Sequence, residues 1–209
     1  MIDRRAMIAG LCVSPWWAGL AQAAPRSATA LVAAARRQVG VTRAYDPAYS
    51  RLSFPNGDVD RSKGVCTDVV IRAYRDALGL DLQALVNADM RSAFAAYPRT
   101  WGLRAPDRNI DHRRVPNLGT WLSRQGAALP IPPGSAGWRP GDIFTSLVDQ
   151  AGTHIGIVSD RNGRNGPLII HNIGAGAREE DGLLADHGPL PVGADLDLPF
   201  HAQHGEGAG

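Results

Sequence analysis

The chain has 209 residues, of which 44% are hydrophobic, with 22 lysines and arginines against 20 aspartates and glutamates. This length suits a single domain with its own apolar core. The formal net charge of +2 leaves no strong electrostatic footprint for nucleic acid, so we expect no nucleic-acid partner.

Residues 1–23 have the layout of a secretory signal peptide. Two adjacent arginines precede an apolar run over residues 6–21, and small residues then suit cleavage before Ala24. The arginine pair resembles a twin-arginine leader. An uncleaved anchor is the alternative. We expect a periplasmic or secreted protein with no membrane span after cleavage, because no other apolar run is long enough to cross a bilayer.

The remaining chain divides into three parts by composition and periodicity. Residues 24–30 are predicted to be a linker, 31–181 a single domain, and 182–209 an irregular tail in which disorder is one alternative. The regular pattern fades after Glu179, where Gly, Pro, Asp and His become frequent.

Helical periodicity dominates the first half of the domain, and strand-like runs dominate the second. Helices are predicted over residues 31–39, 65–78, 82–96 and 115–125. Between the first two lies a long loop, 40–63, which we interpret as one wall of a cleft. Strands are predicted over 142–147, 154–159 and 168–173. This order predicts an α+β domain with N-terminal helices packed on a small antiparallel sheet.

Cys66 is the candidate nucleophile. Cys12 lies in the predicted leader, so after cleavage Cys66 would have no cysteine in its own chain to pair with. The first turn of a helix lowers the pKa of a thiol, and a nearby imidazolium does the same. The alternative is that Cys66 is a small buried hydrophobic residue.

Two histidines on the predicted strands favour the catalytic interpretation. Asn162-Gly163 is a strong hairpin turn signal between these strands, and a hairpin centred there places His154 directly opposite His171. Side chains paired in this way begin about 5 Å apart on one face. A competing turn at Asn165-Gly166 would break the pairing. We predict that His154 takes the proton of Cys66 and that His171 orients its ring.

A charged cluster supplies candidate substrate contacts. His112, Arg113 and Arg114 follow one another in a polar loop, and the two arginines could clamp a substrate carboxylate. Asp58, from the earlier loop, could join them. A structural ion-pair cluster that holds the loop is the alternative.

The motifs around these residues resemble a secreted bacterial family of domains of unknown function (DUF1287). The resemblance covers residues 31–181 and is carried by the segments 64–72, 109–118, 140–143, 154–160 and 170–176. The order Cys, Pro-Gly-Asp, His-Ile-Gly-Ile and a later polar residue also resembles, more distantly, the NlpC-type papain-like cysteine hydrolases. That resemblance implies a papain-like fold, with Cys66 as nucleophile, His154 as base and His171 as orienting residue.

These observations predict an exported cysteine hydrolase that cleaves an amide bond without cofactor or metal, and the NlpC-type resemblance implies that its foremost substrate is a peptidoglycan stem peptide. Hydrolysis of another amide or ester is the nearest alternative. A non-catalytic wall-binding module on the same scaffold is a second. A zinc site formed by Cys66, His154 and His171 is a third, since all three are zinc-ligand types.

Overall fold

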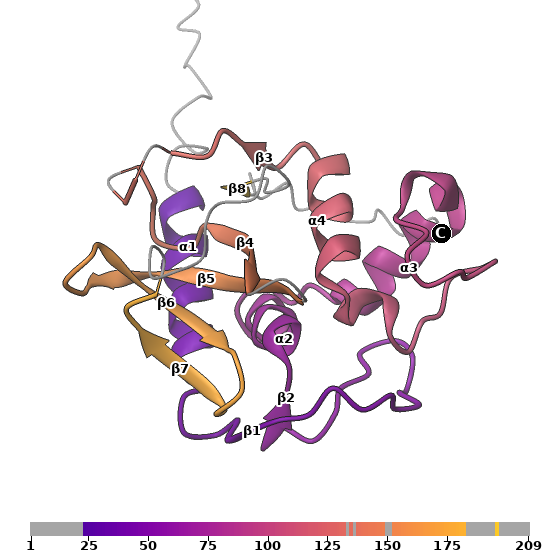
Figure 1. The fold of residues 1–209 in the computed structure, drawn as a ribbon, viewed down its shortest axis with the longest axis horizontal. Coiled ribbons are helices and arrows are strands. Elements are labelled where there is room, and N and C mark those ends of the chain that lie inside the picture. The colour runs from indigo at the N-terminus through magenta and orange to yellow at the C-terminus, as the bar shows by residue number, and fades with distance from the viewer. Residues whose placement is uncertain (1–22, 133, 136, 149–151, 183–194, 197–209) are drawn as a thin grey trace, which may run out of the picture.

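The computed structural model describes residues 23–132, 134–135, 137–148, 152–182 and 195–196 (Figure 1). The predicted signal peptide and most of the predicted tail lie outside these residues. Within them, the helices come first and an antiparallel sheet follows, so the predicted α+β class is confirmed.

The helices match the predicted positions except at the N-terminus. They are α1 Ala23–Arg36, α2 Cys66–Leu78, α3 Leu82–Ala93 and α4 Val115–Arg124, with short 3-10 turns η1 Phe94–Ala96 and η2 Asp111–Arg113. Because α1 begins at Ala23, residues 24–30 are helical rather than the predicted linker. None of the helices in the described part of the chain is long and apolar enough to cross a bilayer.

Helix α2 is the central helix of the fold and carries Cys66 as its first residue. The Asp68 carboxylate accepts a hydrogen bond from the Val65 backbone N–H at 2.7 Å, which satisfies one of the unpaired donors at a helix start. Gly79 ends the helix in the left-handed conformation, at φ 68°. The apolar side of α2 packs in the main core with Val32 and Ala35 of α1.

The main sheet has six strands in the order β3-β8-β4-β5-β6-β7, and its paired neighbours are antiparallel. The strands are β3 Ala128–Leu129, β4 Ile143–Val148, β5 Gly152–Asn162, β6 Pro167–Asn172, β7 Ala177–Glu180 and β8 Asp195–Leu196. Strand β7 was not predicted, and β8 forms within the predicted irregular tail.

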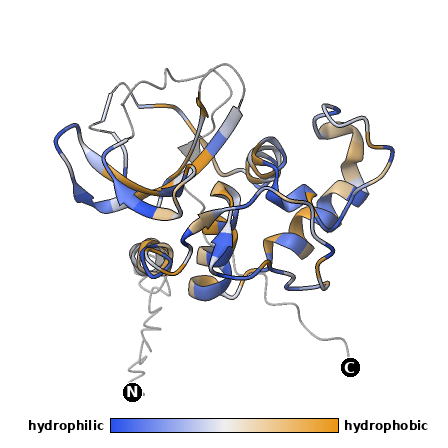
Figure 2. Ribbon diagram, turned by 60° about the horizontal axis from the view of Figure 1, so that its bottom comes forward, coloured by the Kyte–Doolittle hydropathy of each residue, from blue (hydrophilic) through white to orange (hydrophobic). Residues whose placement is uncertain are grey.

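The sheet has two differently occupied faces. Figure 2 shows it as a curved layer with α1 and α2 on one side. Ile155, Ile157 and Ile170 join the main core with these helices. Since strand side chains alternate between faces, His154 shares the opposite face with Val158, and His171 shares it with Ile169. Val158 and Ile169 form a second, smaller cluster with Phe144 and Trp138.

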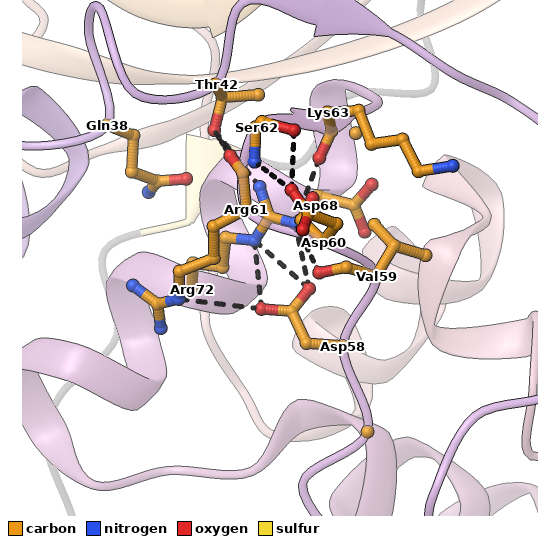
Figure 3. Close-up of polar contacts among 12 residues, drawn as sticks. Gln38, Thr42, Asp58, Val59, Asp60, Arg61, Ser62, Lys63, Asp68 and Arg72 are labelled. Carbon is orange, nitrogen blue, oxygen red and sulfur yellow. Dashed lines mark hydrogen bonds and ion pairs between the residues drawn. The ribbon is translucent and has the colours of Figure 1, made fainter.

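The long loop between α1 and α2 is organised around Arg72 (Figure 3). It contains a two-residue parallel pair, β1 Ala44–Tyr45 with β2 Lys63–Gly64. The Arg72 guanidinium bonds the Asp58 carboxylate at 2.9 to 3.1 Å and the Lys63 carbonyl at 3.0 Å. The Arg72 side chain is 0% exposed, because the loop folds over it.

Candidate active site

The Cys66 thiol lies where α2 meets the end of the β5–β6 pairing. The Val158 N–H points toward β4 and donates to the Asp142 carbonyl at 2.8 Å. Because successive backbone N–H groups of a strand point to opposite sides, the Ile155 N–H points toward β6. Strands β5 and β6 are paired as far as Ile157 and Ile170. The Ile155 N–H lies beyond that point and hydrogen-bonds the Cys66 sulfur instead. The sulfur therefore lies beside the residue that follows His154.

Two side-chain hydrogen bonds fix the start of α2 at this position. Asn172, the residue after His171, donates from Nδ2 to the Gly64 carbonyl at 2.9 Å. Thr67 donates from its hydroxyl to the Arg113 carbonyl at 3.0 Å. The nucleophile candidate is thus held between β6 and the η2 loop, by contacts that the sequence pattern alone does not reveal.

The resting state of the thiol differs from the prediction. Burial raises the pKa of Cys66 to about 11, because the side chain is only 4% exposed and a thiolate there would lose its hydration. The backbone N–H groups of Ile155 and Thr67 oppose this shift, and the nearby Asp68 charge adds to it. The predicted lowering of the pKa by the helix start is therefore outweighed, and the thiol is protonated at neutral pH.

The two histidines form a hydrogen-bonded pair. His154 Nε2 lies 2.8 Å from His171 Nδ1, and His171 Nε2 lies 2.9 Å from a carboxylate oxygen of Glu180 on β7. Both rings are buried. The three side chains lie on the sheet face away from α1 and α2, so a chain of hydrogen bonds runs from β5 across β6 to β7.

The predicted register of this hairpin is wrong by two residues, yet the histidines still meet. The Gly163 N–H donates to the Gly166 carbonyl at 2.7 Å, which centres the turn on the two residues between them. The register then shifts between Val158 and Asn162. Continuing the pairs beyond Ile157 and Ile170 places His171 opposite Gly156, diagonal to His154. An even shift keeps every side chain on its face.

Gly156 makes room for the histidine pair. A Cβ at this position would lie 2.6 Å from Phe144 Cε1 and 3.2 Å from His171 Cβ. We expect Gly156→Ala to lower the free energy of unfolding by about 1–3 kcal/mol, because the Phe144 ring has to move within a packed cluster. Urea unfolding measures the change.

Gly119 in α4 is the matched control, since a Cβ there would meet nothing within 4 Å. Gly119→Ala is expected to raise the free energy of unfolding by about 0.5–1 kcal/mol, through the lower backbone entropy of the unfolded chain. Equal effects of the two substitutions would contradict the packing role of Gly156.

Two of the predicted substrate contacts have internal partners. Arg113 donates to both oxygens of Asp68, at 2.8 and 2.9 Å, in a buried ion pair. Asp58 is occupied by Arg72 and also lies 3.4 Å from Arg75. These contacts favour the structural alternative for both residues, and their contact with substrate stays a prediction.

His112 is buried on η2 and is 2% exposed. Burial lowers its pKa from 6.5 to about 4, and the Arg113 charge opposes the partly compensating charge of Asp68. The folded protein therefore holds a neutral imidazole that the unfolded chain protonates more readily. As pH falls from about 6.5 to 4, this difference removes about 3 kcal/mol of stability.

His112→Leu is expected to reduce this loss of folding stability at acid pH. The Nδ1 atom has no hydrogen-bond partner within the described residues, so an apolar replacement loses no bond at that atom. The free energy of unfolding of each protein, measured at pH 7 and at pH 4.5, gives the slope of its stability with pH. A packing cost of the substitution is the same at both pH values and does not change the slope. Identical slopes would contradict the assignment to His112.

Arg114 is the member of the cluster that borders a pocket. Its guanidinium bonds Asp111 at 2.8 Å and lies 4.1 Å from the centre of the Trp101 ring. Phe94, Leu103 and Asn117 complete this side of the pocket. The buried Asn117 Oδ1 has no hydrogen-bond partner within the described residues. A substrate contact at Arg114 stays a prediction.

Two residues, Tyr45 and Glu180, were missed by the sequence analysis. Burial raises the pKa of the Tyr45 phenol, and the charge of an ionised Cys66 raises it further. Glu180 was missed because it lies in a charged run without strand periodicity. Its alternation with Glu179 is the signal that could have placed it on the histidine face.

Within the part of the chain that the structure describes, no group of three or more His, Cys, Asp or Glu residues is arranged to hold an ion. The direct hydrogen bond between the two rings occupies His154 Nε2 and His171 Nδ1, so these two atoms do not bind a metal while that bond is made.

The fold and site define an α+β domain with a buried cysteine beside a histidine pair. The chain belongs to the family described as Domain of unknown function (DUF1287), which matches residues 32–189. It is 53% identical over 156 residues to the "Uncharacterized protein YijF" of Escherichia coli (strain K12), covering 74% of this chain and 76% of that protein. No solved structure matches. The predicted family is confirmed.

Proposed function

We propose that this protein is an exported cysteine hydrolase that cleaves an amide bond, foremost a peptide bond of the peptidoglycan stem. The proposal assigns it a papain-like scaffold of the NlpC type, with Cys66 as nucleophile, His154 as base and His171 as the orienting residue. One observation carries it most directly. The Ile155 N–H bonds the Cys66 sulfur, which brings the thiol to β5 next to the residue that follows His154, whose ring pairs with His171 on the other face of the sheet.

The proposed reaction starts from a protonated thiol and a neutral imidazole, and it requires the His154 ring, which lies on the sheet face away from α2, to reach the Cys66 sulfur. His154 takes the thiol proton as the sulfur attacks the amide carbonyl, which forms a tetrahedral intermediate. The C–N bond breaks as His154 returns that proton to the leaving amine, and a thioester remains on Cys66. Water, deprotonated by His154, then hydrolyses the thioester to the carboxylate and restores the thiol.

The developing oxyanion needs donors that are already oriented. Backbone N–H groups at the start of α2 are suitable, because the first turn of a helix leaves its amides without intrahelical partners. The Tyr45 hydroxyl, whose pKa an ionised Cys66 raises, is a further candidate donor. Preoriented donors of this kind contribute about 3–4 kcal/mol each to the barrier reduction.

The direct test is digestion of purified peptidoglycan by the full chain, exported and processed by its host. Mass spectrometry of the released fragments should show cuts within the stem peptide, and Cys66→Ala should release none. A panel of model amides and esters, assayed in parallel, distinguishes another substrate class. If the protein cleaved none of these substrates, the proposed hydrolase activity would be contradicted.

A non-catalytic wall-binding module is the second candidate. The observation that favours it is the burial of Cys66, which leaves the thiol protonated and shielded. In that case the wild-type protein should sediment with peptidoglycan, release no fragments, and bind equally well as Cys66→Ala.

A further inference from the structure

Glu180 is the outermost member of the hydrogen-bonded chain that begins at His154. It is the last residue of β7, and its Oε1 lies 2.9 Å from His171 Nε2. The carboxylate side chain is 38% exposed, whereas the His171 side chain is 6% exposed. Glu180 therefore connects a buried imidazole pair to the protein surface.

An ionised carboxylate can only accept hydrogen bonds, and this decides where the ring protons are. His171 must donate from Nε2 to Glu180, so the Nδ1 of a neutral His171 carries no proton and accepts. The 2.8 Å contact then requires His154 to donate from Nε2. A neutral His154 consequently has its unprotonated, basic nitrogen at Nδ1.

We propose that Glu180 is a positioning residue that fixes this tautomer of His154 through His171. Without the Glu180 carboxylate as acceptor for His171 Nε2, the hydrogen bond between the two rings could run in the opposite direction, with His171 Nδ1 donating to His154 Nε2. That arrangement places the remaining proton of His154 on Nδ1 and removes the base. The tautomer assignment rests on geometry alone, and only its effect on rate rests on the proposed function.

The surroundings of Glu180 support a single role for it. Arg178 lies on the same strand with Nη1 3.9 Å from Oε2, which leaves Oε1 for His171. The adjacent Glu179 points to the other face, where it bonds Arg36 at 2.7 to 3.1 Å. Alternation along β7 thus gives two neighbouring glutamates different partners.

The test is the protonation state of each ring nitrogen, measured by 15N NMR on histidine-labelled full-length protein. The wild type should show His154 with its proton on Nε2 and His171 with its proton on Nε2. Glu180→Leu should yield a mixture of tautomers at both rings. Glu180→Gln should largely retain the wild-type pattern, because the amide carbonyl still accepts. An unchanged pattern in Glu180→Leu would overturn the proposal.

Asp160→Asn is the matched control, since Asp160 is a carboxylate of similar exposure, 43%, paired with Arg36 on the same sheet. It should leave both ring patterns unchanged. For hydrolysis, we expect Glu180→Leu to lower kcat about tenfold with little change in KM. A tautomer change in a protein with no hydrolysis supports the Glu180 assignment and rejects only the proposed function.

Discussion

Replacing Cys66 by alanine is expected to abolish hydrolysis while the fold survives. The rate should fall about a thousandfold or more, because removal of a nucleophile leaves only binding and oxyanion stabilisation. Unfolding should change by only about 1 kcal/mol, since a single sulfur atom is removed from the core. Fragment release from peptidoglycan and urea unfolding measure the two effects.

Cys66→Ser is the matched variant, because it keeps a hydroxyl nucleophile of similar size in the same place. A serine hydroxyl is a far weaker acid than the thiol, so this variant should also be nearly inactive. The 15N pattern of His154 and His171 should be the same in both variants as in the wild type. Wild-type-like turnover by either variant would reject Cys66 as the nucleophile.

The sequence predicts the elements of the site better than their exact pairing. The hairpin turn and the irregularity near Val158 displaced the predicted register, because turn residues such as Asn162-Gly163 indicate a reversal but do not fix where the ladder begins. A shift by two residues leaves each side chain on the same face of the sheet. For this reason the His154–His171 contact could be predicted from alternation even though the pairing was wrong.

Sequence periodicity does not reveal contacts between charged residues that are far apart in the chain. Strand β7 looks polar in sequence, yet Glu179 is held by Arg36 from α1, so an ion pair rather than apolar alternation secures it to the helices. The pKa of Cys66 was misjudged for a related reason. A helix start is visible in the sequence, but burial of the sulfur against β5 is a property of the assembled fold.

The loop before Cys66 connects these findings to the position of the nucleophile. Residues of this loop bond Arg72 and then continue through β2 into α2, while Asn172 of β6 holds the Gly64 carbonyl. The buried guanidinium therefore stabilises the segment that delivers the thiol to the sheet. We expect disruption of this loop to affect both stability and catalysis.

Arg72→Leu is expected to lower the free energy of unfolding by about 3–5 kcal/mol. The substitution leaves Asp58 without its main partner and strips donors from the carbonyls of Val59, Asp60 and Lys63. Buried acceptors without donors account for most of the cost. Urea unfolding at neutral pH measures it.

Arg61→Ala is the matched control, because it removes an arginine from the same loop. Its side chain is 47% exposed and pairs with Asp76 at 2.7 Å on the surface. Water replaces such a partner readily, so the expected cost is under about 1 kcal/mol. If Arg72→Leu were as mild as Arg61→Ala, the loop would not depend on the buried guanidinium, and Cys66 would be positioned by the contacts of Asn172, Thr67 and the Ile155 amide.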